Sequence, residues 1–307
     1  MNARGWVTLI AAIASAAVAG AQELEPRLYQ NAPLGLNGLV LAYGYSTGNI
    51  LVDSSLPIEG ATAQIHGLTM GYVRSIDFFG KSAKLDVAIP LAWGTFEGFV
   101  AGEFRTRTPS GLADPRFRLA VNLLGAPALS RREFASYRQK TIVAASVQIA
   151  APLGQYDPDK LVNLGANRWS FRPELGVSNA RGRWYLEMAA GAWLFTKNPD
   201  YYGGSSLTQS PLYFVKGDVV YHFGTSVWLA LNFGFANGGE TRVDGVSAAT
   251  LQRNSRAGAT FSFPIAQRNS LKVVWTRGLT TRIGADFDSL NVVYQYTWAS
   301  GGERKSP

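Results

Sequence analysis

Few side chains of this sequence could perform catalytic chemistry. A nucleophilic serine needs a general base within hydrogen-bond reach, and only two histidines, His66 and His222, are available. His66 is followed by Gly67-Leu-Thr-Met70, which is not the His-x-Ser-Asn string of lipid-cleaving enzymes, and no Gly-x-Ser-x-Gly occurs. There is also no His-Glu-x-x-His, no Walker A string and no calcium-loop spacing. The sequence therefore predicts no catalytic residue, no metal ligand and no cofactor.

A second set of chemically capable side chains is ionic and occupies every second position between apolar residues. Lys216 and Asp218, for example, alternate with Val215 and Val219. If the apolar stripes face outwards, eleven ionic side chains line an interior: Lys84, Asp86, Arg116, Arg118, Arg172, Glu174, Glu187, Lys216, Asp218, Arg256 and Lys272. These seven cations and four carboxylates predict either a lumen with a mild preference for anions or, the favoured interpretation, ion pairs that fill the interior.

The elements that must position these side chains are β-strands, because a period of two is the signature of a strand with one apolar face. The pattern is clearest over Ser289 to Trp298, where Leu290, Val292 and Tyr294 share a face. Twelve segments show it: 37–47, 65–78, 82–92, 113–124, 140–150, 169–179, 183–194, 211–223, 225–236, 252–264, 269–280 and 288–298. Within the second segment, Met70 to Arg74 fits either face and predicts a β-bulge.

The connections between these segments alternate in length. Tight turns, such as Gly80-Lys81 and Arg181-Gly182, alternate with long links rich in Gly, Pro, Asp and Ser, such as 93–112 and 151–168. The link 125–139 departs from this rhythm because it is long where a tight turn is expected. Short turns on one rim and long loops on the other, with an even number of strands, are typical of a bacterial outer-membrane barrel.

The N-terminus predicts export. Arg4 precedes an apolar run from Trp6 to Val18, and Ala19-Gly20-Ala21 offers a cleavage site. We therefore expect a cleaved signal peptide at 1–21, an N-terminal periplasmic or plug segment at 22–36, a barrel at 37–298 and a tail at 299–307. The alternative for residues 6–20, a membrane anchor, is disfavoured because a spanning helix needs about 20 apolar residues.

Composition narrows the class further. The chain has 307 residues, 16% of them charged, and no Cys, which excludes a disulfide framework. After residue 21 there is no run of 18 uninterrupted apolar residues, so membrane crossing would require strands. The strands of a soluble β-sandwich also alternate between apolar and polar residues. Aromatic residues near the strand ends, and the need for a sheet in hydrocarbon to leave no unpaired edge strand, favour instead an all-β, antiparallel transmembrane barrel of about twelve strands with periplasmic termini.

Several local strings resemble a family of predicted outer-membrane transporters named for the meta-pathway of phenol degradation. The strings are Glu23-Leu-Glu-Pro-Arg27, Asn31-Ala-Pro-Leu-Gly-Leu-Asn37, Gly111-Leu-Ala-Asp-Pro115, Ala151-Pro-Leu-Gly-Gln-Tyr156, Arg172-Pro-Glu-Leu-Gly176 and Asn254-Ser-Arg-Ala-Gly258. The resemblance implies a channel linked to the catabolism of aromatic compounds, without specifying a substrate.

The sequence thus predicts a passive, porin-like channel for small molecules in the outer membrane of a Gram-negative bacterium. A structural or adhesive barrel and a lipid-modifying barrel enzyme are the alternatives. Its expected partners are outer-membrane lipid and lipopolysaccharide, a small-molecule solute and the barrel-assembly machinery. The formal net charge of +8 could attract nucleic acid, but an exported barrel would not meet it, and no nucleic-acid partner is expected.

Overall fold

The computed structural model describes residues 24–52, 58–224 and 226–300. The predicted signal peptide and the end of the tail, residues 301–307, lie outside the described residues. In the described part of the chain, no helix is long and apolar enough to cross a membrane.

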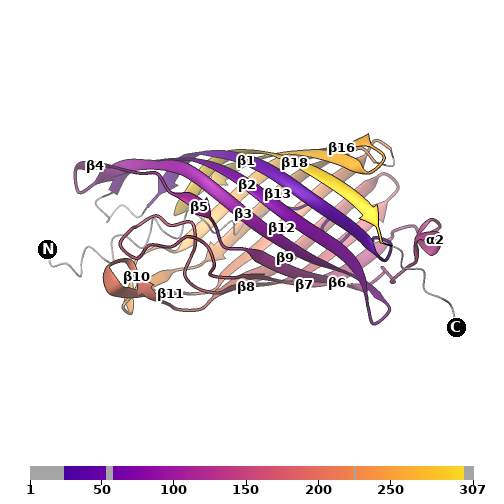
Figure 1. Ribbon diagram of the computed structural model, residues 1–307, viewed down its shortest axis with the longest axis horizontal. Coiled ribbons are helices and arrows are strands. Elements are labelled where there is room, and N and C mark those ends of the chain that lie inside the picture. The colour runs from indigo at the N-terminus through magenta and orange to yellow at the C-terminus, as the bar shows by residue number, and fades with distance from the viewer. Residues whose placement is uncertain (1–23, 53–57, 225, 301–307) are drawn as a thin grey trace.

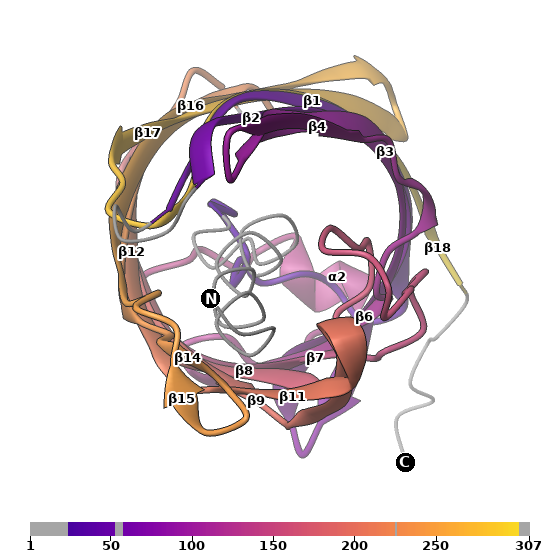
Figure 2. The same ribbon diagram turned by 90° about the vertical axis from the view of Figure 1, so that its left-hand side faces the viewer.

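Twelve antiparallel strands close into a barrel, which Figure 1 shows from the side and Figure 2 along its axis. Each strand pairs with its sequence neighbours in the barrel, and β1 pairs with both β2 and β18, which closes the ring. The barrel strands are β1 (Leu36–Leu51), β2 (Ile58–Phe78), β3 (Lys81–Val100), β6 (Arg116–Leu124), β7 (Thr141–Ala150), β8 (Ser170–Arg181), β9 (Trp184–Phe195), β12 (Leu212–His222), β13 (Trp228–Gly238), β16 (Gln252–Ala266), β17 (Asn269–Thr280) and β18 (Gly284–Ala299). The predicted fold class is confirmed.

The outer face of the barrel is apolar. Leu39 and Leu41 on β1, Met70 on β2 and Leu290 on β18 are all exposed, whereas the residues between them are half-buried. Because each such side chain belongs to an alternating stripe, the exposed apolar residues form a continuous band around the barrel. An apolar outer band of this kind suits lipid rather than water.

Aromatic side chains border this band at two levels. Towards the loop end, the His66 ring lies between Tyr45 and Trp93 and accepts or donates a hydrogen bond of 2.7 Å with the Tyr43 hydroxyl. Near the opposite end, the ring centroids of Tyr72 and Trp298 are 6.2 Å apart. Aromatic girdles at both interfaces are a feature of outer-membrane barrels. His66 therefore belongs to an outward-facing aromatic cluster.

Both ends of the barrel sheet meet at the rim that carries the short turns. Leu36 pairs with Ala299, so β1 begins where β18 ends. The unexpectedly long link after β6 contains the short helix α2 (Arg131–Phe134), whose first turn is closed by a capping box between Ser130 and Glu133. In Figure 1 this helix and the described C-terminal end lie at the same end of the molecule.

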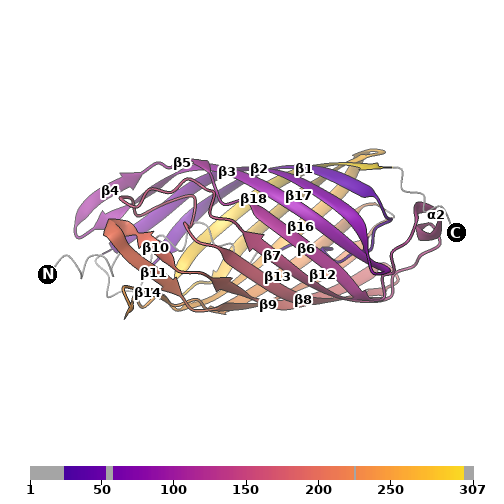
Figure 3. The ribbon, with the colours of Figure 1, turned by 60° about the horizontal axis from the view of Figure 1, so that its bottom comes forward.

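The other rim is extended by additional strands. β4 (Glu103–Arg107) and β5 (Ser110–Leu112) pair with β3, and a separate sheet consists of β10 (Asn198–Tyr201), β11 (Ser205–Gln209), β14 (Thr241–Val243) and β15 (Val246–Ser247), with the 3-10 turn η1 (Tyr202–Gly204) between β10 and β11. Figure 3 shows the β10, β11 and β14 strands together at this loop end.

Two details of the predicted strands differ from the structure. β2 and β3 are longer than predicted and pair beyond the apolar band, where the alternation is reversed: Ala61 and Ala63 are buried, and Thr62 and Gln64 are exposed. The predicted bulge at Met70 to Arg74 is wrong, because these residues pair in unbroken register with Leu85 to Ile89. The register of this pair shifts instead between Glu59 and Thr62, at the loop end.

Candidate functional site

The segment before β1, residues 24–35, packs against strands on several sides of the barrel interior. Gly35 makes the turn into this segment: its φ is +71°, and a Cβ there would lie 2.9 Å from the backbone oxygen of Ser300. Pro26 and Pro33 lack the backbone N–H that a ladder needs, so the segment does not add a strand. Leu24 is buried, and Leu28 is half-buried.

Tyr29 anchors the segment to β7 and β8. Its hydroxyl lies 2.7 Å from a Glu174 carboxylate oxygen, to which it donates, and 3.1 Å from the Ser146 hydroxyl. The ring lies directly over Gly176, where a Cβ would come within 2.2 Å of it. A glycine at this point of β8 is therefore required by the close approach of the tyrosine ring.

Arg27 connects the same segment to β9 and β12. Its backbone N–H donates to the Glu187 carboxylate at 2.6 Å. Its guanidinium lies 4.2 Å from the centroid of the Tyr185 ring and 2.6 Å from His222 Nε2. A cation over an aromatic face adds attraction to the contact. In the described part of the chain, the side-chain contacts of His222 are with Arg27 and with the Tyr185 ring.

A third anchor is ionic and reaches β6 and β3. Glu25 pairs with Arg118 Nη1, and Arg118 Nε lies 3.0 Å from an Asp86 oxygen. Lys84 donates to the backbone oxygen of Leu28 at 2.9 Å. Three of the ionic residues predicted from the sequence, Lys84, Asp86 and Arg118, therefore contact the N-terminal segment or each other.

Glu174 is the centre of a second ionic group. Lys216 Nζ lies 3.1 Å from one of its oxygens, and Arg172 Nη2 lies 3.7 Å from the other. The Arg172 guanidinium also lies 5.4 Å from the Trp193 ring and 5.7 Å from the Phe214 ring. All three charged side chains are buried, and burial of ions is tolerated when they are paired in this way.

The remaining predicted ions also lie on the less exposed faces of their strands. Asp218 accepts a hydrogen bond of 2.6 Å from the Asn232 amide. Arg116 interacts electrostatically with Asp114, Arg256 with Asp286, and Lys272 with Glu25. Glu25 also interacts electrostatically with Arg172 and Lys216, and Asp218 interacts with Glu187 and Lys216. The ions around the N-terminal segment therefore form one connected network, whereas Arg116 and Arg256 interact with carboxylates outside the predicted set.

Sequence reasoning missed Glu25 and Arg27 as partners of these ions. The signal that could have found them is their spacing, since Glu25, Arg27 and Tyr29 alternate with Leu24, Pro26 and Leu28. The hydrogen bonds of the Tyr29 hydroxyl were not predicted from the sequence either.

A closed antiparallel barrel with an apolar, aromatic-bordered outer face and an ionic inner face defines a bacterial outer-membrane β-barrel. Residues 45–294 match the family described as "Putative MetA-pathway of phenol degradation", and the chain belongs to this family. The resemblance drawn from the sequence is confirmed.

Solved structures with the same fold are outer-membrane barrels. The COG4313 outer membrane channel from Pseudomonas putida F1 superposes with a TM-score of 0.76 at 20% identity, over 90% of this chain and 100% of that one. The beta domain of the Bordetella autotransporter BrkA gives a TM-score of 0.53 at 10% identity, over 85% and 99%. The search of curated proteins finds no match.

Proposed function

We propose that the protein is a passive, energy-independent outer-membrane channel for small molecules. The observation that carries this proposal is the contrast between the two faces of the barrel: the lipid-facing side is apolar, and the interior holds ions where a soluble fold would hold an apolar core. A barrel of about eight strands is already just filled by side chains, so twelve strands leave room for a path. The Pseudomonas putida protein of similar fold, itself a channel, supports the proposal.

The interior charge favours anions. With Glu25 and Arg27 included, the interior set holds eight cations and five carboxylates. Because an excess of positive charge attracts anions into a narrow path, the channel should prefer them. The family is named for phenol degradation, and we therefore propose compounds of aromatic catabolism as the solutes.

The N-terminal segment narrows the path. With cleavage after Ala21, as the sequence predicts, two residues precede Leu24, the first described residue of this segment. The contacts of Glu25, Arg27 and Tyr29 hold the segment against five different strands. This segment is therefore the constriction of the channel. The partners of the protein outside the solute path are lipopolysaccharide and the barrel-assembly machinery.

Planar-bilayer recording tests the channel. The purified protein should produce stepwise currents without an energy source, and deletion of residues 23–35 should raise the single-channel conductance, because no barrel strand is changed. Absence of steps from folded protein would refute the channel. Unchanged conductance in a folded deletion variant would refute the constriction and leave the channel intact.

A further inference from the structure

The loop end of β8 and β9 contains a buried arginine that lacks a full set of partners. Arg168 lies two residues before the start of β8 and is 7% exposed. One Nη2 hydrogen bond goes to the Gln209 side chain, and the guanidinium lies 4.5 Å from the centroid of the Phe195 ring. Its Nε and Nη1 have no hydrogen-bond partner among the described residues. Such a group is costly to bury unless something else satisfies it.

One neighbouring side chain shares this property. The Tyr201 hydroxyl is also buried, has no hydrogen-bond partner in the described chain and interacts electrostatically with Arg168. Trp193 belongs instead with the interior ionic group, because its ring lies against the Arg172 guanidinium. The unpartnered Arg168 nitrogens and the Tyr201 hydroxyl can all donate hydrogen bonds, so an acceptor between them would satisfy both side chains.

The nearest carboxylate does not meet this need. Asp114 interacts electrostatically with Arg168, but its two oxygens accept the backbone N–H groups of Gly154 at 2.9 Å and Ala166 at 2.8 Å. Those bonds hold the 151–168 loop in place. Burial lowers the pKa of Arg168 to about 10, so its cation is not fully compensated by its surroundings.

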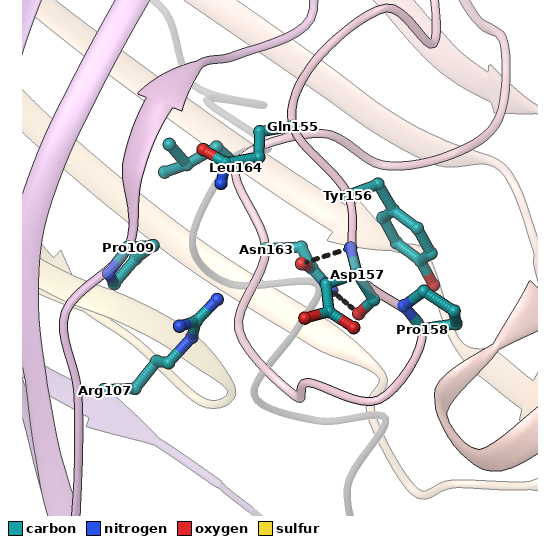
Figure 4. A pocket seen from close by; sticks show the side chains of 8 residues that line it. All are labelled: Arg107, Pro109, Gln155, Tyr156, Asp157, Pro158, Asn163 and Leu164. Atoms are coloured by element: carbon teal, nitrogen blue, oxygen red, sulfur yellow. Dashed lines mark hydrogen bonds between the residues drawn. The ribbon is translucent and has the colours of Figure 1, made fainter.

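A cavity lies beside this region at the loop end. Tyr156, which also interacts electrostatically with Arg168, lines a cavity of about 360 Å³ together with Arg107 and Asn163. Figure 4 shows the tyrosine ring and the Arg107 guanidinium on different sides of this cavity. The Tyr156 hydroxyl is fixed by Asn198 and the backbone oxygen of Asp200.

We propose that Arg168 and Tyr201 form a binding site for a small organic monocarboxylate. A carboxylate supplies the missing acceptors and the missing negative charge. A monoanion is favoured over a dianion because Asp114 already places one negative charge near Arg168. The proposal rests on the channel function and adds a solute-binding site at the loop end of the barrel. Binding at this site does not itself require conduction.

Calorimetric titration of benzoate into the purified protein in non-ionic detergent tests the site. Wild type should bind benzoate, and Arg168→Gln should weaken binding by about tenfold or more, because a charge-assisted hydrogen bond is lost. Arg105→Gln is the matched control, since Arg105 lies on β4 at the same end and its side chain is 68% exposed. Inorganic phosphate and benzyl alcohol should bind more weakly than benzoate.

A milder variant keeps the test decisive if Arg168→Gln does not fold. Tyr201→Phe removes one donor and retains the ring, and it should weaken benzoate binding about two- to tenfold. The proposal is overturned if wild type binds no benzoate, so that buried water alone serves these donors. It is equally overturned if the variants bind like the control, or if phosphate or benzyl alcohol binds as tightly. Conduction without binding would refute this site alone, and binding without conduction would refute only the channel.

Discussion

A single methyl group on the barrel wall should release the N-terminal segment. Gly176→Ala places a Cβ 2.2 Å from Tyr29 Cε2, and an ordinary contact begins near 3.4 Å, so the ring must retreat by about 1.2 Å. That movement breaks the 2.7 Å bond from the Tyr29 hydroxyl to Glu174. A hydrogen bond to a charged group contributes about 1.5–3 kcal/mol, so the ratio of docked to released segment should fall by a factor of about 10 to 150.

Hydrogen exchange and conductance report this release independently. In Gly176→Ala, the backbone amides of residues 24–35 should exchange faster, and the mean single-channel conductance should rise. Gly67→Ala is the matched control, because it adds the same methyl group to β2 with no atom nearer than 3.9 Å. If the two variants show the same exchange and conductance, the docking of Tyr29 does not control the path, and the reasoning is refuted.

Three further changes test the interior and the turns. Glu174→Gln should shift the reversal potential further towards anions, because Lys216 and Arg172 lose their carboxylate; an unchanged potential would place this group outside the ion path. Replacing Arg116 and Arg118 with Glu should shift the reversal potential towards cations, and no shift would mean that these two side chains are remote from the path. Gly125→Ala should lower the temperature at which the folded band is lost on a detergent gel, because Gly125 has φ +78° and a Cβ there would lie 1.8 Å from the Thr141 oxygen; Gly182→Ala, with φ +62° and open space, should lower it less.

The barrel could be predicted from the sequence because lipid imposes a strict rule on the outward face. Tyr213, Val219 and Leu290 had to be apolar wherever they met hydrocarbon, so their alternation marked the strands. Beyond the apolar band this rule ends. Thr62 and Gln64 on β2 are exposed and polar, and the buried Ala61 and Ala63 alternate with them, so the apolar side of this extension faces inwards and does not continue the outward stripe that marked the strands.

The partners of the interior ions could not be predicted in the same way. Alternation shows that Glu174 and Lys216 share the inner face, but it does not place them 3.1 Å apart across an intervening strand, because that depends on strand tilt and stagger. Arg118 forms an ion pair with Glu25, which lies in a segment that belongs to no strand. Arg168 lies in a loop, where no periodicity distinguishes an inward from an outward side chain.

Liposome swelling tests passive passage through this barrel most directly. Liposomes that contain the folded protein are transferred into isotonic solutions of small neutral and anionic solutes, with no energy source, and light scattering follows the entry of solute. The account predicts that wild type admits small solutes and that deletion of residues 23–35 increases the rate and admits larger ones. The wild-type and deletion proteins must both be inserted and heat-modifiable in these liposomes. If such liposomes then swell no faster than empty ones, the result contradicts the account.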